Sequence, residues 1–172
     1  MLEALAYKRG FEPDEETGDF AAALAWPRVL DLFAGSGGLG IEALSRGAKT
    51  AEFVEQDREA ARILISNLRT TGLDEHARVH ERPVALALRA VRVPVDLVFV
   101  DPPYEDATAI PATMEALAAP GVLLPTSVVV LEQAAKAAPP DSIGLLPLAS
   151  SRKHGRTRIS LYASGEAWPL LS

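Results

Sequence analysis

The chain has 172 residues, of which 48% are hydrophobic and 23% are charged, a balance typical of one soluble globular domain. Its formal net charge is −6, opposite in sign to that of proteins that hold nucleic acid mainly through phosphates, so an RNA or DNA substrate would require a local basic patch. Cysteine is absent, which excludes a disulfide framework, cysteine-ligated zinc or iron–sulfur sites and a thiolate nucleophile.

Neither a metal site nor membrane contact is expected. The three histidines (His76, His80 and His154) have a spacing that matches no metal site. The first residues lack a basic stretch followed by an apolar run, and no apolar stretch reaches the length of a membrane span. We therefore expect a cytoplasmic protein without a membrane anchor, and we expect it to be a monomer.

The chain is predicted to divide into a short leading segment, one domain and a tail. Residues 1–27 are predicted to hold a short helix over 1–11 and an acidic loop over 12–19. The main domain is expected over 28–163. The tail over 164–172 has no hydrophobic period.

Strand and helix patterns alternate through the main domain. Strands are expected at 28–33, 50–55, 77–81, 95–100, 127–133, 144–151 and 156–162, and helices at 38–47, 58–70, 84–91 and 112–119. The fourth strand is apolar through nearly its whole length, as in a strand buried on both faces of a parallel sheet. The last two strands are expected to form an antiparallel hairpin at the sheet edge. The pattern predicts an α/β fold, a doubly wound and mostly parallel seven-stranded Rossmann-like sheet with its ligand at the carboxyl ends of the strands.

A glycine-rich loop follows the first predicted strand. Gly35, Gly37 and Gly40 have the spacing G-x-G-x-x-G, and Glu55 lies twenty residues after Gly35, at the end of the second predicted strand. This combination matches the dinucleotide fingerprint, in which the acidic residue binds ribose hydroxyls. It fits NAD and S-adenosyl-L-methionine (AdoMet) equally well, because both carry an adenosine.

Asp31, near the end of the first predicted strand, favours one of these two cofactors. A carboxylate facing the loop would repel a pyrophosphate, whereas it would attract the ammonium and sulfonium charges of AdoMet. The alternative is that Asp31 only accepts hydrogen bonds from the amides of the loop. The loop therefore favours AdoMet over NAD.

The second chemical signal is the motif Asp101-Pro102-Pro103-Tyr104, directly after the fourth predicted strand. An exocyclic amine on a base is a poor nucleophile, and the Asp101 carboxylate and the Pro102 carbonyl can accept both of its hydrogens. Two prolines stiffen the loop, and Tyr104 offers a face on which an extruded base can stack. The alternative is that the prolines only end the strand and Tyr104 packs locally. Methylation at a pyrimidine C5 is excluded, because it needs a thiolate.

Four segments together resemble a known family. LDLFAGSGGLGIEALSRGA, FVEQDREA, DLVFVDPPYE and RKHGRTRISLY are similar to those of the RsmD-type methyltransferases, which act on the N2 amine of a guanine in small-subunit (16S) rRNA. The resemblance covers residues 28–162 and implies a class I AdoMet-dependent fold with Asp101, Pro102, Pro103 and Tyr104 as catalytic residues. The cofactor-binding residues expected from the loop and from this resemblance are Asp31, Phe33, Gly35, Gly37, Gly40, Glu55, Gln56, Pro83 and Val84.

The sequence departs from the family pattern at two places. Family members usually begin with a basic strand pair and an RPT…RE segment, whereas this chain starts at MLEALAYKRG, and the missing part would supply RNA contacts. The family often has an acidic residue near the adenine where this chain has Glu81 to Val84, so we expect apolar or backbone contacts from Pro83 and Val84. The predicted RNA-binding residues lie in the late basic loop, where ordinary solvated charges are the alternative: Arg152, Lys153, Arg156 and Arg158.

The leading hypothesis is an AdoMet-dependent guanine-N2 methyltransferase of small-subunit rRNA that recognises an assembled or partly assembled ribosomal particle. DNA adenine-N6 methylation is a second hypothesis, because the same motif serves that amine, although no target-recognition domain is evident. A third is an AdoMet-binding module that is inactive without its N-terminal part or a partner. A fourth, an NAD-dependent enzyme, would be stabilised by nicotinamide cofactors instead of AdoMet.

Overall fold

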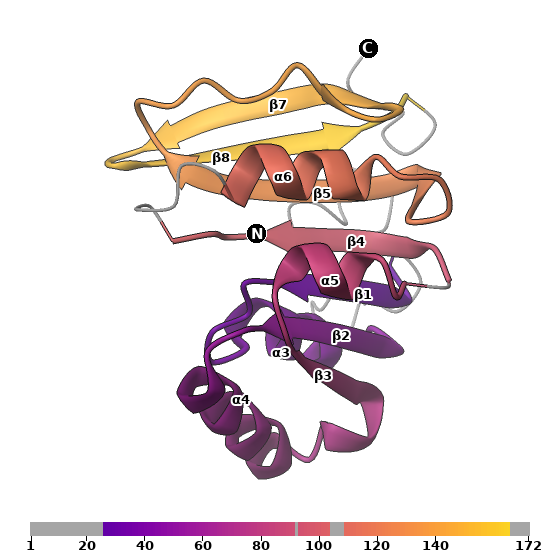
Figure 1. Ribbon diagram of the computed structural model, residues 1–172, viewed down its shortest axis with the longest axis vertical. Helices are drawn as coiled ribbons and strands as arrows, with labels where there is room; N and C mark the ends of the chain where they lie inside the picture. Colours follow the sequence, from indigo (N-terminus) through magenta and orange to yellow (C-terminus); the bar gives the residue numbers. More distant parts are fainter. Residues whose placement is uncertain (1–25, 92, 104–108, 166–172) are drawn as a thin grey trace, which may run out of the picture.

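The computed structural model describes residues 26–91, 93–103 and 109–165 (Figure 1). The helix expected over 1–11, the acidic loop over 12–19 and Tyr104 lie outside the described residues. In the described ranges the strands are β1 (Arg28–Leu32), β2 (Thr50–Glu55), β3 (Ala77–Glu81), β4 (Val95–Val100), β5 (Leu123–Ala134), β6 (Ser142–Ile143), β7 (Leu146–His154) and β8 (Thr157–Ala163). The helices there are α3 (Gly38–Ser45), α4 (Arg58–Thr71), a 3₁₀ turn at Asp74–His76, α5 (Val84–Leu88) and α6 (Ala109–Leu117).

The strands form one twisted sheet in the order β3-β2-β1-β4-β5-β8-β7-β6. The first five strands of this order run parallel, and β8, β7 and β6 continue the sheet in antiparallel pairs. The predicted doubly wound α/β fold and its antiparallel edge hairpin are confirmed. The predicted count of seven strands is wrong, because the described residues contain an eighth. The additional strand, β6, has only two residues, which is too short to leave a hydrophobic period in the sequence.

Local sequence signals explain where the helix α4 begins and ends. The Asp57 carboxylate accepts the backbone N–H groups of Glu59 and Ala60 at 2.9 and 2.8 Å, which caps the first turn. Gly72 ends the helix with a φ of 68°, a left-handed conformation that glycine adopts without strain. The helix thus runs between two residues that could be recognised from sequence.

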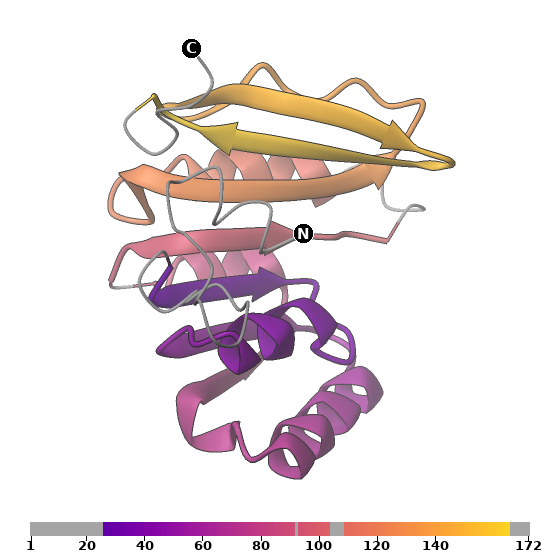
Figure 2. The ribbon, with the colours of Figure 1, turned by 180° about the vertical axis from the view of Figure 1, so that it is seen from behind.

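The helices cover the two faces of the sheet. The helix α3 lies in front of the sheet in Figure 2, on the face where the side chains of α3 and α4 pack with Phe53 and Phe99. The helices α5 and α6 cover the other face, where Met114 and Leu117 pack with Val98 and Tyr162 (Figure 1). Strand β4 lies between β1 and β5 and is almost completely buried, as its apolar run predicts. No helix in the described part of the chain is long and apolar enough to span a bilayer.

The parallel strands place the site at one edge of the sheet. Leu32 of β1 pairs with both Val54 of β2 and Val100 of β4, and Val100 in turn pairs with Leu131 of β5. The residues that follow these four therefore lie side by side, although they are far apart in the sequence. This carboxyl edge lies to the left in Figure 1, where the arrowheads of β4 and β5 point.

Candidate active site

A cavity of about 320 Å³ opens at the carboxyl edge of the parallel strands. Its walls come from the loops after β1, β2, β3 and β4. Eight of the predicted site residues line it together: Phe33, Gly35, Glu55, Gln56, Val84, Asp101, Pro102 and Pro103. The other lining residues are Val54, at the end of β2, and Arg82, which the sequence interpretation did not assign to the site. Four other predicted site residues are not part of its lining: Asp31, Gly37, Gly40 and Pro83.

The three positions of the loop are glycines for different structural reasons. A Cβ on Gly37 would lie 2.2 Å from Leu64 Cδ1, and a Cβ on Gly40 would lie 2.3 Å from Phe53 Cε1. These two glycines are therefore required by the packing of the loop against α4 and β2. Gly35 lines the cavity with a φ of 54°, and a Cβ there would meet no atom of the described residues within 4 Å. Only Gly35 keeps its own side of the cavity open for a ligand.

Glu55 links the two loops that border the cavity. Its Oε2 accepts the N–H of Gly35 at 2.8 Å, and its Oε1 accepts the N–H of Asp57 at 2.7 Å. The carboxylate therefore lies directly beside the glycine loop, as the dinucleotide fingerprint requires of a ribose-binding group. A ribose at this position would share the carboxylate with these two amides.

Asp31 is buried beneath the glycine loop. It is only 2% exposed, and its Oδ2 accepts a hydrogen bond from the Gly40 N–H at 2.9 Å. This is the alternative interpretation of Asp31, in which the carboxylate binds an amide of the loop. The pKa of Asp31 is raised from 3.8 to about 7, mainly by burial; the Gly40 hydrogen bond opposes this rise, and the carboxylates of Asp101 and Glu55 contribute to it. A contact between Asp31 and the cofactor stays a prediction. The carboxylate of Asp31 lies close enough to those of Asp101 and Glu55 for the three to interact electrostatically.

Asp101 has a carboxylate neighbour that the sequence interpretation missed. The pKa of Asp101 is raised from 3.8 to about 6, mainly by partial burial and in addition by the charge of Glu132. The pairing of Val100 with Leu131 explains this, because Asp101 and Glu132 are the next residues of the two neighbouring strands. The signal in the sequence is a charged residue that directly follows the apolar run of β5.

The acidic groups at the cavity fit a cationic ligand. Asp31, Glu55 and Asp101 interact electrostatically within one small region, and a positive charge among them would relieve their mutual repulsion. A pyrophosphate at the same place would add to that repulsion. The charges therefore fit AdoMet, whose sulfonium and ammonium groups are positive, and the open side of Gly35 provides space for it.

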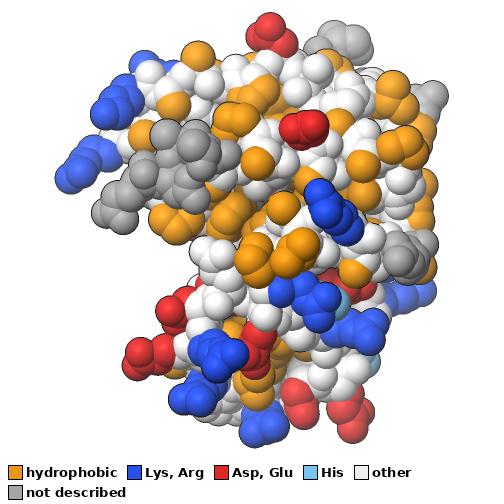
Figure 3. All heavy atoms as spheres, in the orientation of Figure 1, with side chains coloured by type: hydrophobic (Ala, Val, Ile, Leu, Met, Phe, Trp, Pro, Cys, Tyr) orange, Lys and Arg blue, Asp and Glu red, His pale blue; other side chains and the backbone are white. Residues whose placement is uncertain are grey.

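The predicted RNA-binding residues lie on the hairpin of β7 and β8. Arg152, Lys153 and Arg156 are exposed, and Figure 3 shows Lys and Arg side chains at the end of this hairpin, on the same edge as the cavity. Arg158 is engaged within the protein, because its Nη1 donates to Ser151 Oγ at 3.0 Å and its Nη2 donates to the Ala135 carbonyl at 3.2 Å. RNA contact by these residues stays a prediction, and for Arg158 it would compete with these bonds.

The fold and the cavity together define the class of the protein. A mostly parallel sheet with a glycine loop after its first strand, an acidic residue ending the second and a cavity at the carboxyl edge is a doubly wound α/β architecture. An Asp-Pro-Pro motif at the end of the fourth strand, inside the same cavity, distinguishes this site from a plain dinucleotide site.

A comparison with known proteins places the chain within this class. The family model described as conserved hypothetical protein 95 matches residues 19–163, and the chain belongs to this family. Together with the relatives named below, this match confirms the resemblance to the RsmD-type methyltransferases.

Individual relatives agree with the assignment to this family. YlbH of Bacillus subtilis, provisionally named an rRNA methyltransferase, is 36% identical over 138 residues, which are 78% of this chain and 74% of YlbH. Ribosomal RNA small subunit methyltransferase D of Escherichia coli is 46% identical over 77 residues, covering 45% of this chain and 38% of that protein. A solved structure of a conserved hypothetical protein from Streptococcus pyogenes has a TM-score of 0.74 and 39% identity, covering 80% of this chain and 85% of that one.

Proposed function

We propose that the protein transfers a methyl group from AdoMet to the exocyclic N2 amine of a guanine in small-subunit rRNA. The observation that carries the proposal is the single cavity in which Asp101 and Pro102 lie together with Gly35 and Glu55. The names of the Bacillus and Escherichia relatives support rRNA as the substrate. The choice of guanine N2 rests on the Asp-Pro-Pro-Tyr motif and on the RsmD-type resemblance.

The residues of the cavity divide into cofactor-binding and substrate-binding groups. Bound AdoMet would supply an electrophilic methyl group on a positively charged sulfur. Glu55 accepts hydrogen bonds from the ribose hydroxyls, and Phe33 and Val84 provide apolar surface for the adenine. Asp31 acts through its charge from beneath the loop, because the lining of the cavity does not include it.

Asp101 and Pro102 act on the target amine. The Asp101 carboxylate and the Pro102 carbonyl accept hydrogen bonds from the two N–H groups of the amine, which favours a tetrahedral nitrogen with an available lone pair. The N–C bond forms as the C–S bond breaks, and the positive charge that develops on the nitrogen is stabilised by the Asp101 carboxylate. The nitrogen then loses one proton to this carboxylate or to water. Positioning and electrostatics suffice for this displacement, so no covalent intermediate with the protein is required.

The pH dependence of the reaction tests the pairing of Asp101 with Glu132. Only the ionised Asp101 accepts both the hydrogen bond and the developing charge, so kcat/KM should decrease as the pH falls through the pKa of about 6. Glu132→Gln removes a neighbouring negative charge, which lowers the pKa of Asp101 and moves this decrease to lower pH. Glu75→Gln, on the exposed 3₁₀ turn, is the matched control and should leave the profile unchanged. Identical profiles for all three proteins would contradict the coupling.

The substrate itself is tested by methyl transfer from labelled AdoMet to protein-free small-subunit rRNA and to assembled small-subunit particles. We expect faster transfer to the particles, because an acidic chain with a small basic patch neutralises few phosphates of free RNA. Digestion of the product to nucleosides should give N2-methylguanosine.

Other products of the same assay contradict the proposal. N6-methyladenosine in a DNA substrate would identify the alternative amine, and AdoMet binding without transfer to any substrate would identify a binding module. Equal transfer to free rRNA and to particles would contradict the preference for the particle and leave the chemistry intact.

A further inference from the structure

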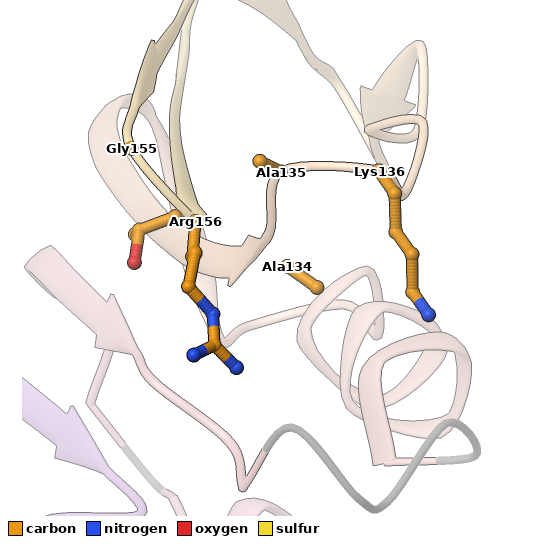
Figure 4. A pocket seen from close by; sticks show the side chains of 6 residues that line it. Ala134, Ala135, Lys136, Gly155 and Arg156 are labelled. Carbon is orange, nitrogen blue, oxygen red and sulfur yellow. The ribbon is translucent and has the colours of Figure 1, made fainter.

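A second hollow lies at the carboxyl edge, beside the strands that end the sheet. It has a volume of about 710 Å³ and lies between the end of β5 and the turn that joins β7 to β8. Figure 4 shows Lys136 and Arg156 on opposite sides of it, with their side chains extending in the same direction. Among the described residues, those that line it are Ala134, Ala135, Lys136, Gly155, Arg156 and Thr157.

The two walls of this hollow are held together by the backbone. Ala134 pairs with Thr157 across β5 and β8, and the Ala135 N–H donates to the Arg156 carbonyl at 2.8 Å. The Arg158 guanidinium adds a second link, because it donates to both the Ala135 carbonyl and the Ser151 hydroxyl. Arg158 is therefore a positioning residue, and it fixes the segment that carries Lys136 relative to the hairpin that carries Arg156.

The lining has the composition of a site for an anionic polymer. Lys136 and Arg156 are both exposed cations, no acidic residue is among the described residues that line the hollow, and the other described lining residues are small enough to admit a ligand of ordinary width. Its volume falls within the range of about 300–1,000 Å³ that is usual for ligand sites. The guanidinium of Arg156 can form paired hydrogen bonds with a phosphate, and the Lys136 ammonium adds a point charge.

The position of the hollow relates it to the cavity of the proposed methyl transfer. Asp101 follows β4 and Lys136 follows β5, and the parallel pairing of these strands brings both to one edge of the sheet. The cavity has the carboxylates of Glu55 and Asp101 in its lining and Asp31 beneath, against one described lining cation, Arg82, so its charge disfavours phosphates. An RNA strand that inserts a base into this cavity therefore needs cationic side chains beside the cavity to bind its phosphates.

We propose that the hollow between the end of β5 and the β7–β8 turn binds the sugar–phosphate backbone of the RNA strand next to the target nucleotide, with Lys136 and Arg156 on a phosphate. The inference rests on the proposed function, because it takes RNA as the substrate. It adds Lys136 to the RNA-binding residues and makes Arg158 a support for the site.

The experiment measures the binding of a fluorescein-labelled, single-stranded 12-nucleotide RNA of mixed sequence to the full chain at several salt concentrations. Lys136→Glu should lower the affinity about tenfold at low salt, and Lys136→Ala should reduce the slope of log K against log salt by about 0.7, the value for one lost phosphate contact. Lys49→Glu is the matched control, because Lys49 is exposed and lies just before β2 at the opposite edge of the sheet. It should change the affinity less than twofold, and all three variants should keep the wild-type AdoMet affinity.

Three outcomes would overturn this inference. Equal losses for Lys136→Glu and Lys49→Glu would show that net charge alone determines RNA binding. Unchanged RNA affinity for Lys136→Glu would show that RNA does not bind in the hollow. If methylation of assembled particles fell at the same time, the hollow would instead contact a protein of the particle. Failure of the proposed function is distinguishable, because wild-type protein would then bind the RNA through Lys136 without methylating any rRNA.

Discussion

Replacing Asp101 with alanine is expected to lower the rate of methyl transfer by about 10²- to 10³-fold while the affinity for AdoMet changes by only a few-fold. The carboxylate acts on the target amine, where the positive charge develops only during transfer. The ribose and the adenine are held by other residues of the cavity, above all Glu55. A loss of rate without a loss of binding is the signature of an interaction that is made mainly in the transition state.

Single-turnover transfer and calorimetric AdoMet titration measure the two quantities on the same protein. Asp101→Asn is the informative companion, because the amide keeps one acceptor oxygen and loses the charge, so its rate should lie between those of the wild type and Asp101→Ala. Asp74→Ala, in the exposed 3₁₀ turn, is the control for a carboxylate outside the cavity. Near-normal turnover by Asp101→Ala would contradict transfer to an amine at this motif.

The elements of this site could be predicted from sequence because each carries a local signal. The segment Val95–Val100, apolar except at Asp96, indicates a buried parallel strand, and the glycine spacing marks the turn after β1. A doubly wound sheet brings the carboxyl ends of such strands together, so Gly35, Glu55 and Asp101 could be expected in one place.

The residues that the sequence interpretation missed depend on strand register. Glu132 faces Asp101 only because β5 pairs with β4 through Leu131 and Val100, and no local pattern specifies this register. Strand β5 is also longer than predicted, since it runs over Leu123–Ala134 and includes Pro125, a residue that is unfavourable in a central strand. The position of Lys136 at the hollow follows from this same register and from the antiparallel pairing with β8.

Asp31 illustrates a different limit, because the two interpretations of its carboxylate differ only in where the side chain points. The same residue could face a ligand or accept a hydrogen bond from the loop, and the sequence is identical in both cases. The structure places Oδ2 on the Gly40 N–H and excludes the side chain from solvent. A buried carboxylate is costly to ionise when one backbone N–H, that of Gly40, is its hydrogen-bond donor within the described residues, and this cost has a measurable consequence.

Asp31→Asn is expected to make the protein without cofactor more stable at pH 8, by about 1–3 kcal/mol in the free energy of unfolding. The pKa of Asp31 is about 7 in the folded protein and 3.8 in the unfolded chain, so the folded state binds more protons between these values. The wild-type protein therefore loses stability as the pH rises from about 4 to about 7. The Oδ1 atom of the asparagine keeps the hydrogen bond from the Gly40 N–H and carries no charge. The gain in stability is reduced because the side-chain NH₂ group of the asparagine is buried as well.

Urea denaturation of both proteins at pH 4, 6 and 8 measures this difference, and comparing the variant with the wild type cancels the titration of all other groups. The gain should be greatest at pH 8 and should decrease toward pH 4, where Asp31 is largely protonated in the folded protein. The same variant should bind AdoMet more weakly, because the cation loses one of its three neighbouring carboxylates. A gain of equal size at pH 4 and pH 8 would contradict a raised pKa of Asp31 in the folded protein. Unchanged AdoMet affinity would show that the charge of Asp31 does not act on the ligand. If both effects are observed, the buried carboxylate costs stability in the free protein and favours a cationic cofactor in the complex.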